Sequence, residues 1–249
     1  MGTLNIDLLM GIPRAVEFIV YITCAIMIYR KRDYYLNKIY GVSLLGWVIY
    51  VLCDAFIFPI GHIEPWFWGT MPGNPAELLP LVANILRDIL IVGACITAFG
   101  YLYASVVIRY GEAKAKEKKL VIFFLSGIII TASLISIFDI IIKDISEIPY
   151  TVSTTYNIMS ILFILIELII YGIAIYQHYE VYKEIDKNKP EKRKILFFIL
   201  GSTFIAAGVI YFVLAGLLLS SIPQIIRGTI GHSIWILSPI FIYYGIKKT

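Results

Sequence analysis

The sequence places ionisable side chains inside long apolar segments, where each one is costly and therefore informative. A charged group at the centre of a membrane helix costs about 2.5–3.5 kcal/mol on insertion scales, so it normally faces the protein interior and has a partner. Arg14 and Glu17 stand three residues apart, on one face of a helix. We expect the ionisable residues of the apolar runs to contribute to one ligand-binding site: Arg14, Glu17, Asp54, Arg87, Asp88, Asp139, Glu167, Arg227 and His232.

Counting residues from the basic segments of the chain places these groups at different depths in a membrane. At about 1.5 Å per helical residue, Glu167 falls near the midplane and Glu17 slightly further from the basic segments. The others lie further still, and none falls in the half of the membrane next to the basic segments. We therefore predict an outward-facing polar pocket for a small polar or ionic ligand.

The same charges could instead hold the helices together. Opposite charges on neighbouring helices pair with one another inside a membrane, and Glu17 has candidate partners in Arg14, Arg87 and Arg227. In that case the charges fix the helix packing and bind no ligand.

The sequence predicts no catalytic set, no cofactor and no metal site. Microbial rhodopsins have seven helices and bind retinal through a lysine of the last helix, but the run 222–246 contains no lysine. Seven-helix hydrolases that bind zinc need several histidines at membrane depth. Of His62, His178 and His232, only the last is expected at that depth.

The composition indicates which elements position these residues. Hydrophobic residues make up 59% of the 249 positions and charged residues 15%, against roughly 45–50% and 25% in a soluble domain. A membrane-spanning helix needs about 20 mostly apolar residues. Runs near that length cover residues 8–29, 39–60, 78–108, 120–142, 156–176, 195–219 and 222–246. We therefore predict an all-α integral membrane protein, with one domain, 1–249, formed by a bundle of seven transmembrane helices.

Lysine and arginine gather in alternate connections between these runs. Segments 30–38, 109–119 and 183–194 hold most of them, and Lys247 and Lys248 add to the same side. Because short basic loops stay in the cytoplasm, the pattern predicts a cell-membrane protein with its N-terminus outside and its C-terminus in the cytoplasm. Basic residues confined to one side favour the lipid bilayer, with its anionic headgroups, and not nucleic acid as the partner.

Two of these basic segments could also bind a protein. Residues 178–194 continue the fifth run as a charged helical stretch as far as Pro190, and residues 109–119 form another charged stretch. We expect that either segment could dock a cytoplasmic partner.

Small side chains predict where two helices approach each other closely. Gly93, Ala94, Thr97, Ala98 and Gly100 lie near one another in the third run. Small residues are enriched where membrane helices touch, because they let the two backbones come close. The third run should therefore pack tightly against a neighbour.

Three kinds of function remain open. The leading prediction is a receptor-like or sensor protein that binds an unknown small ligand from the outer side. The first alternative is a small-solute or proton-coupled transporter, for which a midplane group such as Glu167 is typical. The second is a membrane-embedded enzyme at the outer leaflet that uses carboxylates and His232 as acid and base. No nucleophile or metal set favours the enzyme, so a non-enzymatic function is the prediction.

Overall fold

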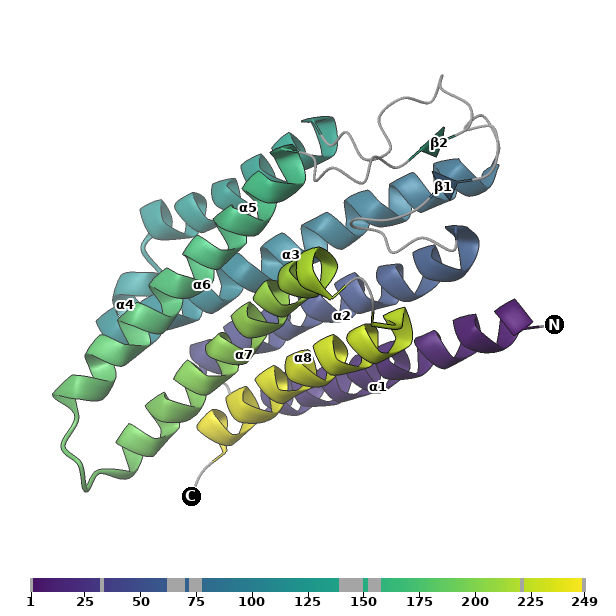
Figure 1. Cartoon of the computed structure of the whole chain (residues 1–249). Helices are drawn as coiled ribbons and strands as arrows, with labels where there is room; N and C mark the ends of the chain where they lie inside the picture. Colours follow the sequence, from purple (N-terminus) through teal and green to yellow (C-terminus); the bar gives the residue numbers. More distant parts are fainter. Residues whose placement is uncertain are drawn as a thin grey trace.

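The chain forms a bundle of long helices (Figure 1). The computed structural model describes residues 2–31, 34–61, 70–71, 78–138, 150–151, 158–219 and 222–247. The helices are α1 (Gly2–Arg30), α2 (Tyr35–Gly61), α3 (Leu78–Tyr110), α4 (Glu112–Ala115), α5 (Lys118–Phe138), α6 (Ile158–Glu184), α7 (Pro190–Leu218) and α8 (Gln224–Ile246). All except α4 are long and apolar enough to cross a membrane, which makes seven such helices among the described residues. This confirms the predicted all-α seven-helix membrane fold.

Two short strands join the connections at one end of the bundle. The strand β1 (Thr70–Met71) pairs antiparallel with β2 (Tyr150–Thr151), and the register places Thr70 opposite Thr151. The pairing links the connection after α2 to the connection after α5.

The helix ends near the basic segments extend beyond the apolar runs. The fifth run was expected to end at Tyr176, with a charged helical extension as far as Pro190, and α6 continues without a break to Glu184. The sixth run was expected to begin at Ile195, but α7 begins with Pro190 in its first turn. Helical hydrogen bonds continue where the chain enters water, and proline at the first position costs none of them.

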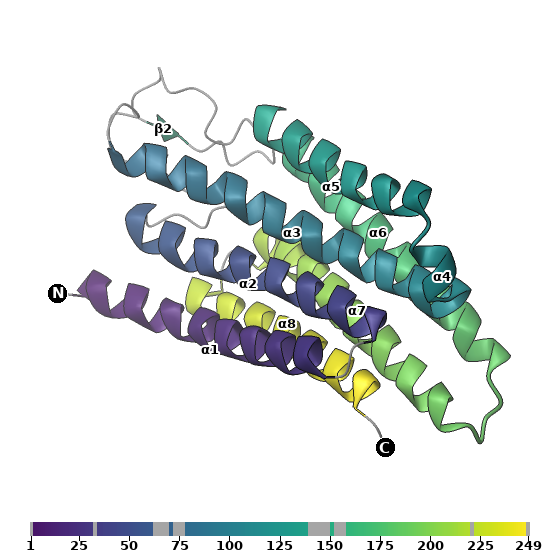
Figure 2. The same ribbon diagram turned by 180° about the vertical axis from the view of Figure 1, so that it is seen from behind.

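The long helices follow one another around a ring. Each of α1, α2, α3, α6, α7 and α8 packs against the next, and α8 packs against α1. Helix α5 lies outside this ring against α3 and, less closely, α6, as the opposite views of Figures 1 and 2 show. Of the seven spans α3 is the most enclosed and α5 the least.

The tightest contact in the ring lies between α2 and α3, where two glycines face each other. A Cβ atom on Gly93 would lie 2.6 Å from the carbonyl oxygen of Gly46. One turn further, the Thr97 hydroxyl lies 3.0 Å from the Ser43 carbonyl oxygen and 2.9 Å from that of Gly93. The small residues of α3 thus allow the close packing that the sequence predicted, and a side-chain hydrogen bond adds to it.

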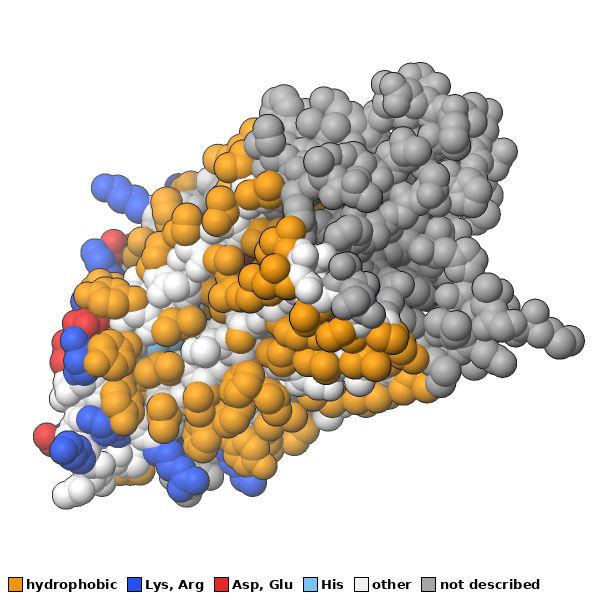
Figure 3. Space-filling model, viewed as in Figure 1, with side chains coloured by type: hydrophobic (Ala, Val, Ile, Leu, Met, Phe, Trp, Pro, Cys, Tyr) orange, Lys and Arg blue, Asp and Glu red, His pale blue; other side chains and the backbone are white. Residues whose placement is uncertain are grey.

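Lysine and arginine side chains gather at the end of the bundle where α1 and α8 end (Figure 3). We call this the basic end. Several of these cations lie over tyrosine rings, with Lys38 4.3 Å from the centroid of Tyr29 and Lys116 4.6 Å from that of Tyr35. Such pairs suit a membrane interface, where aromatic rings meet headgroups.

Helix α4 is folded back onto the basic end of α3. Gly111 separates the two helices with a φ of 83°, a value that favours glycine. The Tyr103 hydroxyl then lies 2.7 Å from the carbonyl oxygen of Ala115 and 2.8 Å from the Tyr35 hydroxyl. These bonds connect α2, α3 and α4.

Substituting the glycine of the closest helix contact should loosen the bundle. We expect Gly93→Ala to lower the free energy of unfolding by about 1–3 kcal/mol, because the added methyl group forces α2 and α3 apart. Thermal unfolding in lipid nanodiscs measures the change. The control is Gly172→Ala on α6, where an added Cβ meets no atom within 4 Å. An equal loss of stability in both variants would contradict the assigned packing.

Candidate functional site

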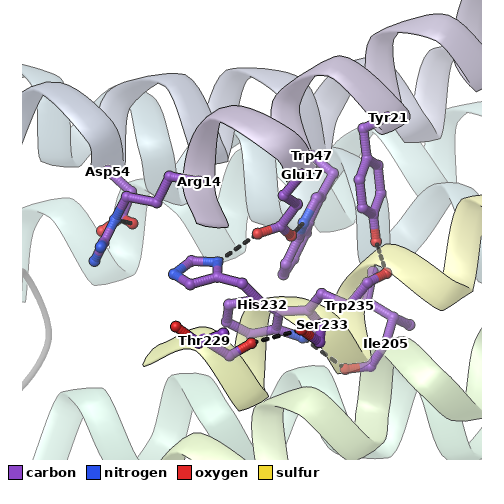
Figure 4. Close-up of polar contacts among 10 residues, drawn as sticks. All are labelled: Arg14, Glu17, Tyr21, Trp47, Asp54, Ile205, Thr229, His232, Ser233 and Trp235. Atoms are coloured by element: carbon purple, nitrogen blue, oxygen red, sulfur yellow. Dashed lines mark hydrogen bonds and ion pairs between the residues drawn. The ribbon is translucent and has the colours of Figure 1, made fainter. Parts of the chain in front are cut away.

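Arg14 of α1 and Asp54 of α2 form a buried ion pair. Arg14 Nε lies 2.5 Å from Asp54 Oδ2, and the two residues are only 5% and 3% exposed. The side chains point toward each other from neighbouring helices (Figure 4). The pair compensates both charges inside the bundle and ties α1 to α2.

The Glu17 carboxylate connects three helices. Its Oε1 accepts a hydrogen bond from Trp47 Nε1 of α2 at 2.7 Å, and its Oε2 lies 2.5 Å from His232 Nδ1 of α8. Glu17 itself is fully buried. Hydrogen bonds to a charged acceptor are about twice as strong as neutral ones, so this one side chain holds α1, α2 and α8 together.

Together, Arg14, Glu17, Asp54 and His232 form what we call the buried charge cluster. Arg14 and Asp54 lie beside the His232 ring in Figure 4, because Arg14 precedes Glu17 by about one turn of α1. The cluster therefore brings together four of the nine residues that the sequence singled out.

An aromatic layer lies between the buried charge cluster and the basic end. Trp47 stacks on Tyr50 with centroids 4.4 Å apart and meets Trp235 edge-on at 4.9 Å, while Phe212 stacks on Trp235 at 4.5 Å. Trp235 fits there because α7 has a glycine beside it: a Cβ on Gly208 would lie 2.2 Å from its Nε1 atom.

Tyr21 of α1 is hydrogen-bonded to this layer. Its hydroxyl donates to the backbone carbonyl of Trp235 at 3.0 Å. Tyr21 and Trp235 were not among the predicted site residues. Their spacing was a usable signal, since Tyr21 follows Glu17 by four residues and Trp235 follows His232 by three.

Glu167 lies apart from the cluster, on α6. The residue is 6% exposed, and its Oε1 has no hydrogen-bond partner within the described part of the chain. Helix α6 packs against α3, α5 and α7, whereas the buried charge cluster lies on α1, α2 and α8. Glu167 therefore lies on a different side of the ring from the cluster. A buried carboxyl oxygen without a protein partner is the kind of group that binds water or a ligand.

The remaining predicted residues are spread around the ring. Arg87 is buried in α3, while its neighbour Asp88 is exposed. Arg227 donates from Nε to the Ile222 carbonyl at 3.0 Å and thereby holds the start of α8. Asp139 lies outside the described residues.

The side chains that bind Glu17 are not the arginines that the sequence offered as candidate partners. His232 and Trp47 bind its two oxygens, and Arg14 pairs with Asp54. The reason is the ring order: α8 packs directly against α1, which brings His232 to the level of Glu17.

The structure buries His178, a residue that was expected outside membrane depth. It is fully buried on α6, beyond the end of the fifth apolar run at Tyr176. Its Nε2 lies 3.3 Å from the Tyr40 hydroxyl, and its ring stacks against Phe198 with centroids 6.0 Å apart. Its burial was not predicted because the apolar run ends before His178, whereas the helix continues and its neighbours cover the residue.

The arrangement suits the exchange of ionic partners better than metal chemistry. Among the described residues, no group of three His, Cys, Asp or Glu side chains is placed to hold a metal ion. The cluster instead contains two contacts between a basic side chain and a carboxylate, Arg14 with Asp54 and His232 with Glu17.

Comparison with known proteins adds no family to this description. No model of a known protein family matches the chain, and no curated protein matches it. The function is therefore argued from the geometry of the interior.

Breaking the Arg14–Asp54 pair should destabilise the bundle strongly. We expect Asp54→Asn to lower the free energy of unfolding by about 3–5 kcal/mol, because Arg14 loses the carboxylate that compensates its buried charge. Thermal unfolding measures the loss. The control is Asp88→Asn, which removes an exposed carboxylate from α3.

A double variant, Arg14→Met with Asp54→Leu, should recover most of the lost stability, because it removes both charges. Equal effects of Asp54→Asn and Asp88→Asn would show that the pair does not stabilise the fold.

Proposed function

We propose that the protein is a receptor-like sensor that binds a small polar or ionic ligand at the buried charge cluster. The observation that carries this proposal is the Glu17 carboxylate, which binds Trp47 and His232 and thereby joins three helices. A ligand that competes for this carboxylate changes the contacts of α1, α2 and α8 together. Such a coupling between binding and helix position is what a receptor requires.

The chemistry of the cluster limits the ligand to a small charged or strongly polar molecule. An anion would compete with Asp54 for Arg14, and a cation would compete with Arg14 or His232 for the carboxylates. All four residues are buried, so binding requires α1, α2 and α8 to separate at this level. The free energy of binding must therefore exceed the free energy of that separation.

Helices α1 and α8 extend from the cluster to the basic end, where a cytoplasmic partner could respond to a change in their packing. There, Lys31 Nζ lies 3.3 Å from the Ile246 carbonyl oxygen and 5.6 Å from the centroid of the Tyr243 ring. The bond from Tyr21 to the Trp235 backbone connects the same two helices halfway. A cytoplasmic partner would bind nearby, at segments 109–119 and 178–194.

A screen of small ions in lipid nanodiscs tests the proposed function. The probes are acetate, inorganic phosphate, ammonium and glycine, and the measurement is the unfolding temperature. We expect at least one probe to stabilise the wild type, by about 2.7 kcal/mol at a concentration a hundredfold above its dissociation constant. The same probe should stabilise Asp88→Asn and should have no effect on Glu17→Gln.

Two results would contradict the receptor. Stabilisation that persists in both Glu17→Gln and Asp54→Asn would place the ligand outside the buried charge cluster. A screen in which no probe stabilises the wild type would contradict the proposal of a small ionic ligand. Uptake of the stabilising probe into proteoliposomes would favour the transporter, for which the unpartnered Glu167 oxygen is the supporting observation.

We also propose that the basic end faces the cytoplasm and that the N-terminus lies outside. The gathering of lysine and arginine side chains at that end supports this orientation, because short basic loops are retained on the cytoplasmic side. Anionic lipids of the cytoplasmic leaflet attract basic segments by about 1 kcal/mol per residue.

Labelling of intact cells measures the orientation. A membrane-impermeant maleimide should label Lys187→Cys, an exposed position between α6 and α7, only after permeabilisation. An N-terminal tag should bind antibody without permeabilisation. The native Cys24, Cys53 and Cys95 are buried, and the unsubstituted protein is the control for their reactivity. Labelling of Lys187→Cys in intact cells would reverse the orientation.

A further inference from the structure

A column of buried polar side chains runs through the ring from Glu167 toward the basic end. In order, its members are Glu167, Tyr171, Tyr101, Ser238, Tyr40 and His178, and we call them the polar column. They come from α2, α3, α6 and α8. Glu167 is 6% exposed and the others are fully buried, so the protein keeps an unusually polar interior on this side.

Contacts connect the members of the polar column in sequence. Glu167 and Tyr171 stand four residues apart on one face of α6, and the Tyr171 ring meets the Tyr101 ring edge-on at 5.8 Å. The Tyr101 hydroxyl lies 2.8 Å from Ser238 Oγ, and the Tyr101 ring lies 5.6 Å from the Tyr40 ring. Tyr40 then contacts His178 through the hydroxyl and Nε2 atoms, 3.3 Å apart.

Several polar atoms along the column have no partner within the described part of the chain. These atoms are Glu167 Oε1, the Tyr171 hydroxyl, His178 Nδ1 and, on the neighbouring α7, Ser202 Oγ. Buried polar atoms in proteins are nearly always bonded to protein or to ordered water. Water can both donate and accept, so it suits hydroxyl, carboxyl and imidazole groups in one row.

We propose that the polar column, together with bound water, conducts protons between Glu167 and the basic end through His178. A proton leaves the Glu167 carboxyl oxygen. Each hydroxyl or water then accepts one proton on its oxygen and releases another. His178 accepts a proton on one ring nitrogen and releases one from the other, so no bond other than O–H and N–H changes. The distance along α6 is about 16 Å.

An apolar ring lies on the side of Glu167 away from the basic end. Phe163 precedes Glu167 by one turn of α6 and is 3% exposed. A further titratable group near Glu167 is Cys95 of α3, which is also buried. This route goes beyond the proposed receptor function, because it uses none of the buried charge cluster and needs no ligand.

Infrared spectroscopy of the full-length protein in nanodiscs tests the route. The readout is the carbonyl band of a neutral carboxylic acid, assigned to Glu167 by its loss in Glu167→Gln. Transfer to D₂O shifts this band, and its rate of shift reports proton exchange at Glu167. We expect fast exchange in the wild type and exchange about tenfold slower in Tyr101→Phe and Tyr40→Phe, which corresponds to ~1.4 kcal/mol in the barrier.

The matched control is Tyr103→Phe. Its hydroxyl lies outside the polar column, where it contacts the Ala115 carbonyl and the Tyr35 hydroxyl. All three variants keep the aromatic ring, and their unfolding temperatures show that they are folded. The proposal is overturned if Glu167→Gln removes no carbonyl band, if the column variants exchange as fast as the wild type, or if Tyr103→Phe slows exchange equally.

Discussion

The Glu17 carboxylate is the group on which the rest of the helix arrangement depends. A carboxylate in a membrane interior must be compensated, and in this protein both of its oxygens are bound by side chains from other helices. Trp47 and His232 can reach it only if α2 and α8 both lie next to α1, so the requirement to satisfy one charge closes the ring. The pair of Arg14 with Asp54 repeats the same constraint one turn away.

The interior contains two polar regions with different properties. In the buried charge cluster, a basic side chain contacts a carboxylate in each of two pairs, Arg14 with Asp54 and His232 with Glu17. In the polar column the groups are hydroxyls, an imidazole and a carboxyl, and some of their atoms have no protein partner. Trp47 belongs to both neighbourhoods, because its indole nitrogen binds Glu17 while its ring stacks in the layer. Trp47 therefore connects Glu17 directly to the aromatic layer.

Close helix packing is the second constraint, and it comes from glycine. Gly46 and Gly93 let the α2 and α3 backbones touch, while Gly208 makes room on α7 for the Trp235 ring. In lipid, association gains little from burying apolar surface, so van der Waals contact and interhelical hydrogen bonds must hold helices together. Thr97, which donates across the α2–α3 contact, supplies one such bond.

The sequence by itself determined the class of the protein and the number of its spans. Apolar runs of spanning length follow from composition alone, and the small residues of α3 indicated its tight contact, since both are local properties of the chain. The sequence also indicated that Arg14, Glu17, Asp54, Glu167 and His232 face the interior, because the membrane penalises every other position. Only the tertiary structure decided which of these groups meet. The ring order brought His232 to Glu17 and left Glu167 on another side, and neighbouring helices buried His178 beyond the end of its apolar run. Partners on different helices depend on rotation and helix order, which no pattern along a single helix encodes.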